Sequence, residues 1–307
     1  MGESADNSRA KPSEAIAVDE SGKPLSLVAM LFGPDRRGLV ARVAGWIYDR
    51  GGNVLHADQH RDAEANVFFQ RIEWTQPGEL ADLRDAAEAF SVMAREALGM
   101  NCRVAISSDQ PRVGALVSKI PHCLQDVAFR WKRRELPGKL VCVISNHQEL
   151  SQFCQSVSLP FHHVENSKGK KPTGEQAMFR ILQAYKLDLL VLARYMQILS
   201  PDFLEAIAIP VINVHHSFLP AFPGSRPYHQ AYARGVKVIG ATAHYVTAEL
   251  DAGPIIGQDV ARISHRHTVA DLIRRGQDLE RNVFAQAIRS HLENRVLVYN
   301  NKTVVFD

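Results

Sequence analysis

The fold is decided by the stretch Ile209-Pro210-Val211-Ile212-Asn213-Val214-His215-His216, in which a short β-branched run gives way to polar side chains. A Pro/Gly-rich loop follows over residues 220–227, so we predict a buried strand here. In open α/β sheets, ligands bind beyond the carboxyl ends of the strands, which is where this polar cluster falls. Asn213 and His215 are two residues apart and therefore point to the same side of the strand. We expect both in a site.

A second apolar run, residues 238–246, repeats this arrangement, and Asp251 lies in the loop that follows it. An amide, an imidazole and a carboxylate together suit attack on a carbonyl group. The carboxylate orients and charges the imidazole, the imidazole shuttles a proton, and the amide donates to a developing oxyanion. Alternatively, His215 and His216 are only strand-end histidines with satisfied hydrogen bonds, and the residues alone leave both interpretations open. His244 is expected to support the Asp251 loop.

The pattern Asn213-x-His215-x-Ser217-x-Leu219-Pro220, with Asp251 seven residues after His244, resembles the active-site signature of formyltetrahydrofolate-dependent formyltransferases. More narrowly, residues 192–199, the pair His215-His216 and residues 226–232 are similar to formyltetrahydrofolate deformylases. The resemblance covers residues 26–307. It implies hydrolysis of 10-formyltetrahydrofolate to formate and tetrahydrofolate.

By this resemblance, Asn213, His215 and Asp251 are the catalytic residues, which activate water and stabilise the tetrahedral oxyanion. The pterin ring of the folate is expected against residues 197–199 and the loop 247–251. With polar neighbours at the strand ends added, the expected substrate-binding residues are Arg194, Met196, Gln197, Ile198, Leu199, His216, Ser217, Thr247, Glu249, Leu250 and His122. Arg194, Arg226 and Lys237 are nearby candidates for holding the folate glutamate tail.

Residues 25–107 alternate as a βαββαβ unit, with strands over 25–32, 54–59, 66–74 and 102–107 and helices over 38–48 and 80–98. Residues 31–40 resemble the start of an ACT domain, a small ligand-sensing fold that often binds amino acids where two copies pair. We therefore expect an ACT-like regulatory or dimerisation domain, a homo-oligomer, and a possible amino-acid effector bound by Asp35, Gly38 and Asn53. A domain that only holds subunits together remains the alternative.

A polar linker, residues 108–111, precedes a new alternation of strands and helices over residues 112–307. Strands are predicted at 113–117, 140–145, 189–192 and 211–214, and a long helix at 269–292. The expected fold class is α/β: an N-terminal βαββαβ (ferredoxin-like, ACT-type) domain followed by a doubly wound, mostly parallel α/β formyltransferase-like domain. Residues 1–24 are expected to form a disordered leader.

The turn after the first strand of the second domain, residues 118–124, contains no glycine, and Pro121 lacks a backbone donor. In the related glycinamide ribonucleotide transformylases this turn is glycine-rich and cradles a phosphate at a helix N-terminus. A site for a phosphorylated amine is therefore expected to be closed, which leaves water as the nucleophile. Two alternatives stay open: a formyltransferase with another amine acceptor, and a folate-binding amino-acid sensor without catalysis.

The composition is that of an ordinary globular protein, with 307 residues, 46% of them hydrophobic and 22% charged, enough for two domains. A net charge of +3 is too mild to indicate a nucleic-acid partner. The four cysteines lack metal-ligand spacing and indicate reduced thiols of a cytoplasmic protein. Because His-Glu-x-x-His is absent and adjacent histidines point to opposite sides of a strand, no metal is expected, and no other cofactor is expected either. No apolar run is long enough to predict a membrane span.

Overall fold

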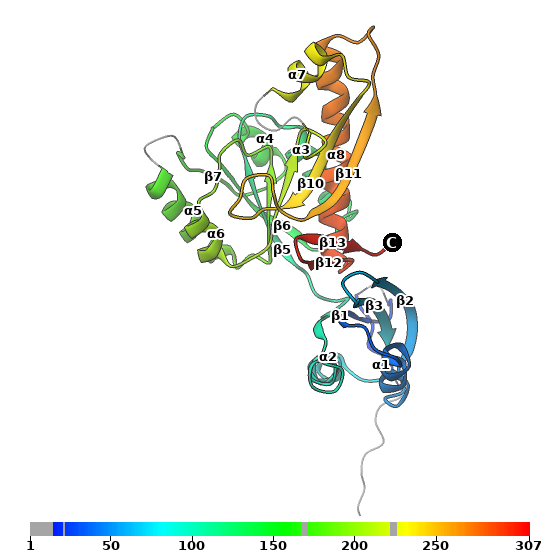
Figure 1. Ribbon diagram of the computed structural model, residues 1–307. Helices are drawn as coiled ribbons and strands as arrows, with labels where there is room; N and C mark the ends of the chain where they lie inside the picture. Colours follow the sequence, from blue (N-terminus) through cyan, green and yellow to red (C-terminus); the bar gives the residue numbers. More distant parts are fainter. Residues whose placement is uncertain (1–14, 21, 167–170, 222–225) are drawn as a thin grey trace, which may run out of the picture. The chain divides into compact units, whose positions relative to one another are not determined.

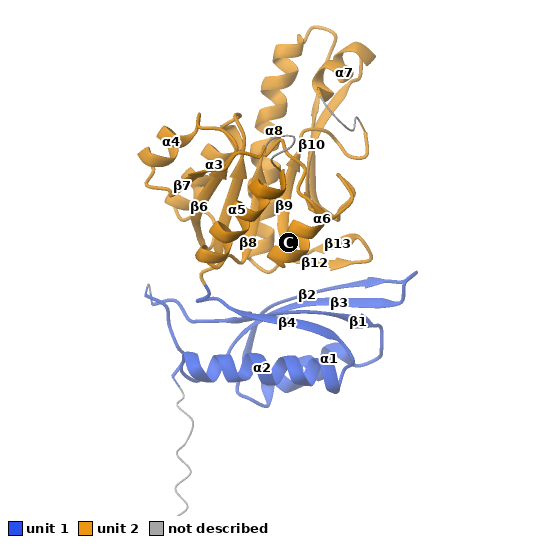
Figure 2. Cartoon of the chain, turned by 90° about the vertical axis from the view of Figure 1, so that its left-hand side faces the viewer, with its two compact units in different colours: residues 1–109, 306 blue, residues 110–305, 307 orange. Residues whose placement is uncertain are grey.

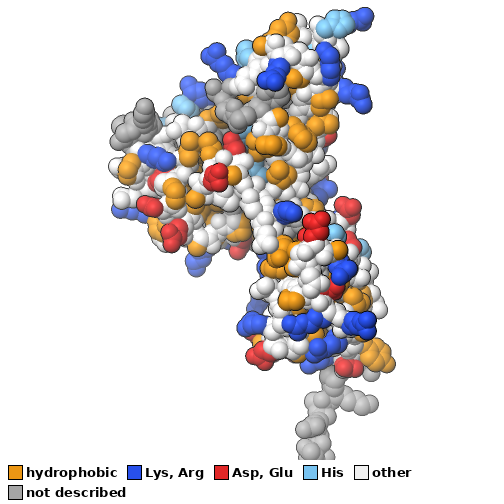
Figure 3. Space-filling model, viewed as in Figure 1, with side chains coloured by type: hydrophobic (Ala, Val, Ile, Leu, Met, Phe, Trp, Pro, Cys, Tyr) orange, Lys and Arg blue, Asp and Glu red, His pale blue; other side chains and the backbone are white. Residues whose placement is uncertain are grey.

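The computed structural model describes residues 15–20, 22–166, 171–221 and 226–307. The chain forms two compact units that divide between Asp109 and Gln110 (Figure 2). Within the described residues, no helix is both long and apolar enough to cross a membrane. Basic, acidic and hydrophobic side chains are all spread over the face shown in Figure 3.

The first unit has the predicted βαββαβ order of elements. These are β1 (Leu27–Pro34), α1 (Leu39–Tyr48), β2 (Asn53–Asp62), β3 (Val67–Thr75), α2 (Leu80–Glu96) and β4 (Asn101–Ile106). The strands form one antiparallel sheet in the order β2-β3-β1-β4, and α1 and α2 lie on the same face of it (Figure 2). The helices pack on that face through a core that includes Val43, Phe90 and Trp74.

Part of the segment assigned to a disordered leader is ordered. The Ala17 amide donates to the Gly78 carbonyl, and the Gly78 amide donates to the Ala15 carbonyl. These backbone hydrogen bonds tie the segment to the turn before α2, which a composition-based prediction of disorder cannot anticipate. The rest of the predicted leader, residues 1–14 and 21, lies outside the described residues.

The second unit is built on a seven-stranded sheet in the order β11-β10-β9-β8-β5-β6-β7. Its strands are β5 (Arg112–Val117), β6 (Lys139–Ser145), β7 (Phe161–His163), β8 (Leu189–Ala193), β9 (Val211–His215), β10 (Val238–Tyr245) and β11 (Ile255–Arg262). The strands from β9 to β7 run parallel, as predicted, whereas β10 and β11 continue the sheet antiparallel.

Helices cover both faces of this sheet. The core on one face contains residues of α3 (His122–Lys132), α4 (Ser151–Ser156), α7 (Pro227–Arg234) and α8 (Val269–Leu292). The core on the other contains residues of α5 (Lys171–Tyr185) and α6 (Pro201–Ile207). The central strand β5 is buried on both sides, with Ala115 in the first core and Leu116 in the second, as a parallel strand in a doubly wound sheet should be.

The helix α8 runs along the sheet (Figure 1) and begins with a capping box in which Thr268 and Asp271 cap each other's backbone amides. Its buried stripe is apolar apart from Glu280, whose side chain is 1% exposed. After α8 the chain ends in a two-stranded hairpin, β12 (Val296–Tyr299) and β13 (Lys302–Val305). A charged residue inside an apolar stripe needs a partner, and this one bears on the site described next.

Candidate active site

A cavity of about 230 Å³ opens where the segments after β8, β9 and β10 meet. It is lined by Leu192, Arg194, Tyr195, Met196, Gln197, Ile198, Leu199, Asn213, Val214, His215, His216, His244, Val246, Thr247, Ala248, Glu249, Leu250 and Asp251. The structure therefore brings Asn213, His215 and Asp251 to one cavity wall. All the residues expected to bind substrate line the cavity too, except Ser217 and His122.

The two exceptions are buried beside the cavity. The Ser217 carbonyl accepts a hydrogen bond from the Thr242 hydroxyl at 2.9 Å, and the Ser217 hydroxyl has no partner among the described residues. His122 is paired with Glu280 of α8, with 2.8 Å between Nε2 and Oε2. Of the other candidates for holding the glutamate tail, neither Arg226 nor Lys237 lines the cavity.

Asp251 reaches the site by a route that differs from the one expected. The sequence suggested two strands ending at the same edge, but β10 is antiparallel to β9 and pairs Tyr245 with Ile212. The carboxyl end of β10 therefore lies beside the start of β9. The loop after β10 folds back, and its closing residues pair with the strand end, since the Tyr245 amide donates to the Pro254 carbonyl.

Gly253 allows this loop to close. A Cβ atom added at Gly253 would lie 1.9 Å from the carbonyl oxygen of Tyr245, so no other residue fits without moving the backbone. Asp251 itself has a φ of +56°, a left-handed conformation at the turn of the loop. The position of the Asp251 carboxylate thus depends on close backbone packing two residues away.

We expect Gly253→Ala to lower kcat/KM by about 10²-fold, because a displacement of about 1 Å at a catalytic group has that order of effect. The matched control is Gly257→Ala in β11, where an added Cβ meets nothing within 4 Å. Steady-state kinetics of both variants test this. Equal activity of the two variants would show that Asp251 does not depend on the loop closure.

Asp251 fixes the protonation pattern of His215. Oδ1 of Asp251 lies 3.2 Å from Nδ1 of His215, so Nδ1 carries the hydrogen and Nε2 is the nitrogen that can accept a proton. Nε2 is buried and has no hydrogen-bond partner among the residues the structure describes. The hydrogen bond from His215 lowers the pKa of Asp251 below 3.8 despite its partial burial, so the carboxylate is ionised at neutral pH.

His244 orients the side-chain amide of Asn213 through a hydrogen bond. Nδ1 of His244 donates to the Tyr245 carbonyl at 2.9 Å, and burial lowers the pKa of this imidazole, so its Nε2 is an acceptor at neutral pH. The Asn213 amide nitrogen donates to that Nε2 at 3.2 Å. One N–H of Asn213 is used in this bond, and the second has no partner in the part of the chain that the structure describes, so it can bind a ligand. His244 is therefore a positioning residue for Asn213 as well as a neighbour of Asp251, 3.8 Å away.

Relatives of known name share this architecture. A sequence model of the formyl transferase family matches residues 111–288. A protein named formyltetrahydrofolate deformylase from Synechocystis sp. is 47% identical over 283 residues, which cover 92% of this chain and 99% of the relative. The chain belongs to the formyltetrahydrofolate deformylase family.

Solved structures agree with this membership. The crystal structure of a formyltetrahydrofolate deformylase from Pseudomonas syringae matches with a TM-score of 0.87 and 43% identity, over 92% of this chain and 95% of that one. A glycinamide ribonucleotide transformylase from Symbiobacterium toebii matches with a TM-score of 0.62 and 32% identity, over 66% of this chain and 97% of that one. The predicted fold class and family resemblance are confirmed.

Beside the cavity of this deformylase family member, Glu280 holds a second polar cluster. Its carboxylate accepts from the Tyr228 hydroxyl at 2.7 Å and pairs with His122, and Arg194 Nε lies 3.5 Å from Oε2. Burial alone would raise the pKa of Glu280, but the hydrogen bond from His122 and the charge of Arg194 outweigh it and hold the pKa below 4.5. A glutamate in the buried stripe of α8 was the sequence signal for this cluster, and it was missed.

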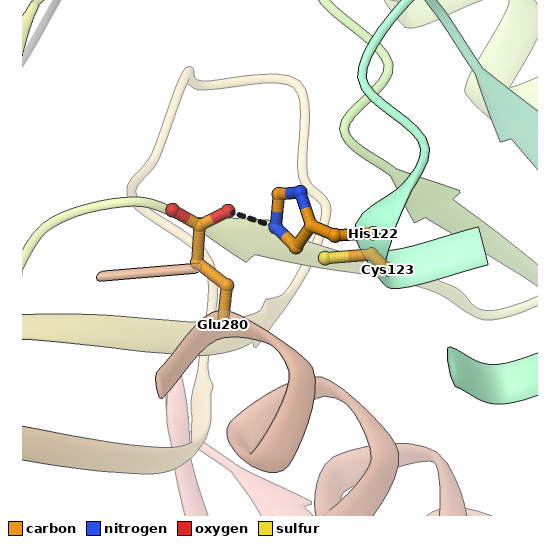
Figure 4. A group of neighbouring side chains, drawn as sticks. All are labelled: His122, Cys123 and Glu280. Carbon is orange, nitrogen blue, oxygen red and sulfur yellow. Dashed lines mark hydrogen bonds and ion pairs between the residues drawn. The ribbon is translucent and has the colours of Figure 1, made fainter. Parts of the chain in front are cut away.

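His122, Cys123 and Glu280 lie close enough to share a metal ion, with candidate ligand atoms within 4.8 Å of one another (Figure 4). Their chemistry does not fit one. The carboxylate is already bonded to His122 and Tyr228 and sits beside the Arg194 cation. Burial, reinforced by the Glu280 charge, raises the pKa of the Cys123 thiol well above 9.0, so it is not a thiolate. Glu280 instead holds His122 and Tyr228 by hydrogen bonds.

His216 lines the cavity beside His215, with 5.1 Å between ring centroids. Because β9 ends at His215, the alternation of side chains along a strand does not extend to His216, and both rings reach the cavity. Burial, followed by the charge of Arg194, lowers the pKa of His216 from 6.5 to about 4. His216 is therefore neutral at physiological pH and adds no second cation to this wall.

We expect this unit to lose stability as the pH falls from about 6.5 to about 4. In this window the unfolded chain protonates His216 while the folded chain does not, so stability is complete above 6.5 and decreases toward 4. Thermal unfolding across this range should show a shallower pH slope in His216→Gln. The matched control His265→Gln removes an exposed imidazole and should retain the wild-type slope. Identical slopes in all three proteins would contradict the assignment.

Proposed function

We propose that this chain hydrolyses 10-formyltetrahydrofolate to formate and tetrahydrofolate. The supporting observation is one cavity that holds an imidazole nitrogen of His215 and an amide N–H of Asn213, both without a partner among the described residues, and the ionised carboxylate of Asp251. His215 can carry a proton, Asn213 can donate a hydrogen bond to an oxyanion, and the charge of Asp251 stabilises the imidazolium. Two relatives of high identity are named formyltetrahydrofolate deformylase, and the match to this chain covers nearly their full length.

The reaction follows from the placement of these groups. A water molecule beside Nε2 of His215 loses a proton to it as the water oxygen attacks the formyl carbon. The formyl oxygen becomes an oxyanion, which accepts the second N–H of Asn213 and faces the new imidazolium. The Asp251 carboxylate bonded to Nδ1 stabilises that imidazolium. The C–N bond then breaks, and His215 returns the proton to the departing folate nitrogen. The products are tetrahydrofolate and formic acid, which loses its proton to solvent to give formate.

The open side of the cavity suits a flat aromatic ring. Met196, Ile198 and Leu250 are each more than half exposed, yet they line the cavity with Gln197 and Thr247 between them. Exposed apolar side chains beside a cavity commonly mark a ligand surface. Polar groups of residues 197–199 and 247–251 would form hydrogen bonds with the polar edge of the ring. In this orientation the formyl group would point toward Asn213 and His215.

For the first unit we propose a regulatory or pairing role as an ACT-like domain of a cytoplasmic homo-oligomer. The expected effector residues lie at the start of α1 and of β2. Gly38 has a φ of +82° and caps α1, Asp35 is paired with Arg61, and Asn53 begins β2. Amino acids are the proposed effector class, and isothermal titration of candidate amino acids into the full chain tests this role.

The proposed activity is tested by incubating the pure protein with 10-formyltetrahydrofolate and no amine, and by measuring formate and tetrahydrofolate together. We expect equal amounts of both products, and release of both slowed by at least about 10²-fold with His215→Ala. If the folate stays formylated until an amine is supplied, the protein is a transferase. If it binds the folate but never releases the formyl group, it is a sensor.

A further inference from the structure

Arg194 has an unusual and unfavourable environment. Its φ is +63°, a left-handed conformation that residues other than glycine rarely adopt. Its side chain is only 9% exposed, and neither Nε nor Nη1 has a hydrogen-bond partner among the described residues. A strained backbone and a buried cation with unsatisfied donors both cost stability. Such costs gather at functional sites, so this residue calls for a functional explanation.

The side chain of Arg194 extends from the wall of the active-site cavity to Glu280, which lies 3.5 Å from Nε. Polar groups surround this space. Tyr228 and His122 are bonded to Glu280, and the ring of His216 lies 6.2 Å from that of Tyr228. Together these buried groups form what we call the polar compartment beside the catalytic wall. The Arg194 guanidinium lies in this compartment, and the same residue lines the cavity.

Gly276 shows how closely this compartment is packed. A Cβ atom added there would lie 2.0 Å from the Tyr228 hydroxyl, so α8 needs glycine in its interior to bring Tyr228 against Glu280. Glycine within a helix is otherwise unfavourable. The arrangement of Tyr228, Glu280 and Arg194 is therefore held by three elements: α7, α8 and the segment after β8.

We propose that Arg194 determines acceptor specificity: its guanidinium, anchored by Glu280, keeps amines out of the space beside the formyl group, so that only water reaches the formyl carbon. Size is the main cause. The side chain fills the compartment, so a nucleophile larger than water has no room there, and its positive charge further disfavours amines that arrive protonated. Water is smaller, and it is not excluded. This inference rests on the proposed hydrolysis, which it refines.

The excluded reaction is formyl transfer to an amine. The amine nitrogen would attack the formyl carbon, the bond from that carbon to the folate nitrogen would break, and the amine's proton would pass to the folate nitrogen. The machinery at Asn213, His215 and Asp251 can serve this reaction without change, since only the nucleophile differs. Removing the guanidinium should therefore redirect part of the turnover.

The test supplies 10-formyltetrahydrofolate with hydroxylamine, a small and largely neutral amine, and measures formohydroxamate and formate after subtraction of the enzyme-free reaction. Wild type should give formate almost alone. Arg194→Gly relieves the backbone strain and empties the compartment, so the ratio of formohydroxamate to formate should rise by about tenfold or more, the lower bound for one pocket contact. Arg194→Lys, which keeps a cation and most of the bulk, should stay near the wild-type ratio. Added guanidinium should lower the ratio again in Arg194→Gly.

Glu280→Gln provides a second route if Arg194→Gly does not fold. It removes the charge that anchors the guanidinium and should raise the ratio in the same direction, by less. An unchanged ratio in the folded variants overturns the inference. So does an Arg194→Gly protein that binds the folate but forms neither product, because Arg194 then takes part in the chemistry itself. Failure of the proposed hydrolysis gives another result: the wild-type protein would release no formate in the absence of hydroxylamine.

Discussion

Replacing His215 with alanine is expected to lower kcat/KM by at least about 10²- to 10³-fold, the loss that follows removal of one oxyanion-stabilising group. The expectation is this large because His215 has two tasks, taking the proton from water and returning it to the folate nitrogen. Its Nε2 is buried with no partner that the described structure supplies, and its Nδ1 is held by Asp251. The kcat/KM of Asn213→Ala should fall by about the same factor, since this variant loses only the hydrogen-bond donor to the oxyanion.

The matched control is His147→Ala, a histidine that lies outside the cavity lining and carries no catalytic role in this account. It should keep near-wild-type kinetics. Single-turnover measurements with excess enzyme separate chemistry from substrate binding. Activity of His215→Ala within about threefold of wild type would remove His215 from the mechanism.

Replacing Glu280 with alanine is expected to lower the free energy of unfolding by about 3–5 kcal/mol, the cost of removing one member of a buried ion pair. Glu280 is 1% exposed, and it is the ion-pair partner of Arg194 and the hydrogen-bond partner of His122. Without it, the Arg194 cation stays buried and uncompensated, and Tyr228 loses its acceptor. Urea unfolding of the full chain measures the change.

Asp278→Ala is the matched control, because it removes an acidic residue from the same helix at a position that is 60% exposed. Its pair with Arg281 is on the surface, so the expected change is within about 0.5 kcal/mol. Equal losses in the two variants would mean that Glu280 contributes no more than an ordinary surface charge.

The elements with strong periodicity were predictable. The helix predicted over residues 269–292 has the observed bounds of α8, because a long amphipathic stripe and a capping residue both mark it. The strands β5, β8 and β9 were predicted within a residue or so, since short apolar runs between turn signals are typical of buried strands. Asn213 and His215 were placed on one wall by their spacing alone, and they do line one cavity.

Strand direction could not be predicted in the same way. An apolar run such as β10 has the same composition whichever way it runs, so its antiparallel pairing with β9 was missed. For the same reason, the sequence did not predict that His244 pairs with Asn213 or that the loop carrying Asp251 folds back. The link from Arg194 to Glu280 depends on contacts between distant parts of the chain, which no local pattern specifies.

The central claim, that water is the nucleophile at this site, is tested most directly by one turnover in water labelled with heavy oxygen. We predict that formate leaves with one heavy oxygen atom and one oxygen from the original formyl group, in equal amount to tetrahydrofolate. Formate without heavy oxygen, or no formate at all until an amine is present, would contradict the account.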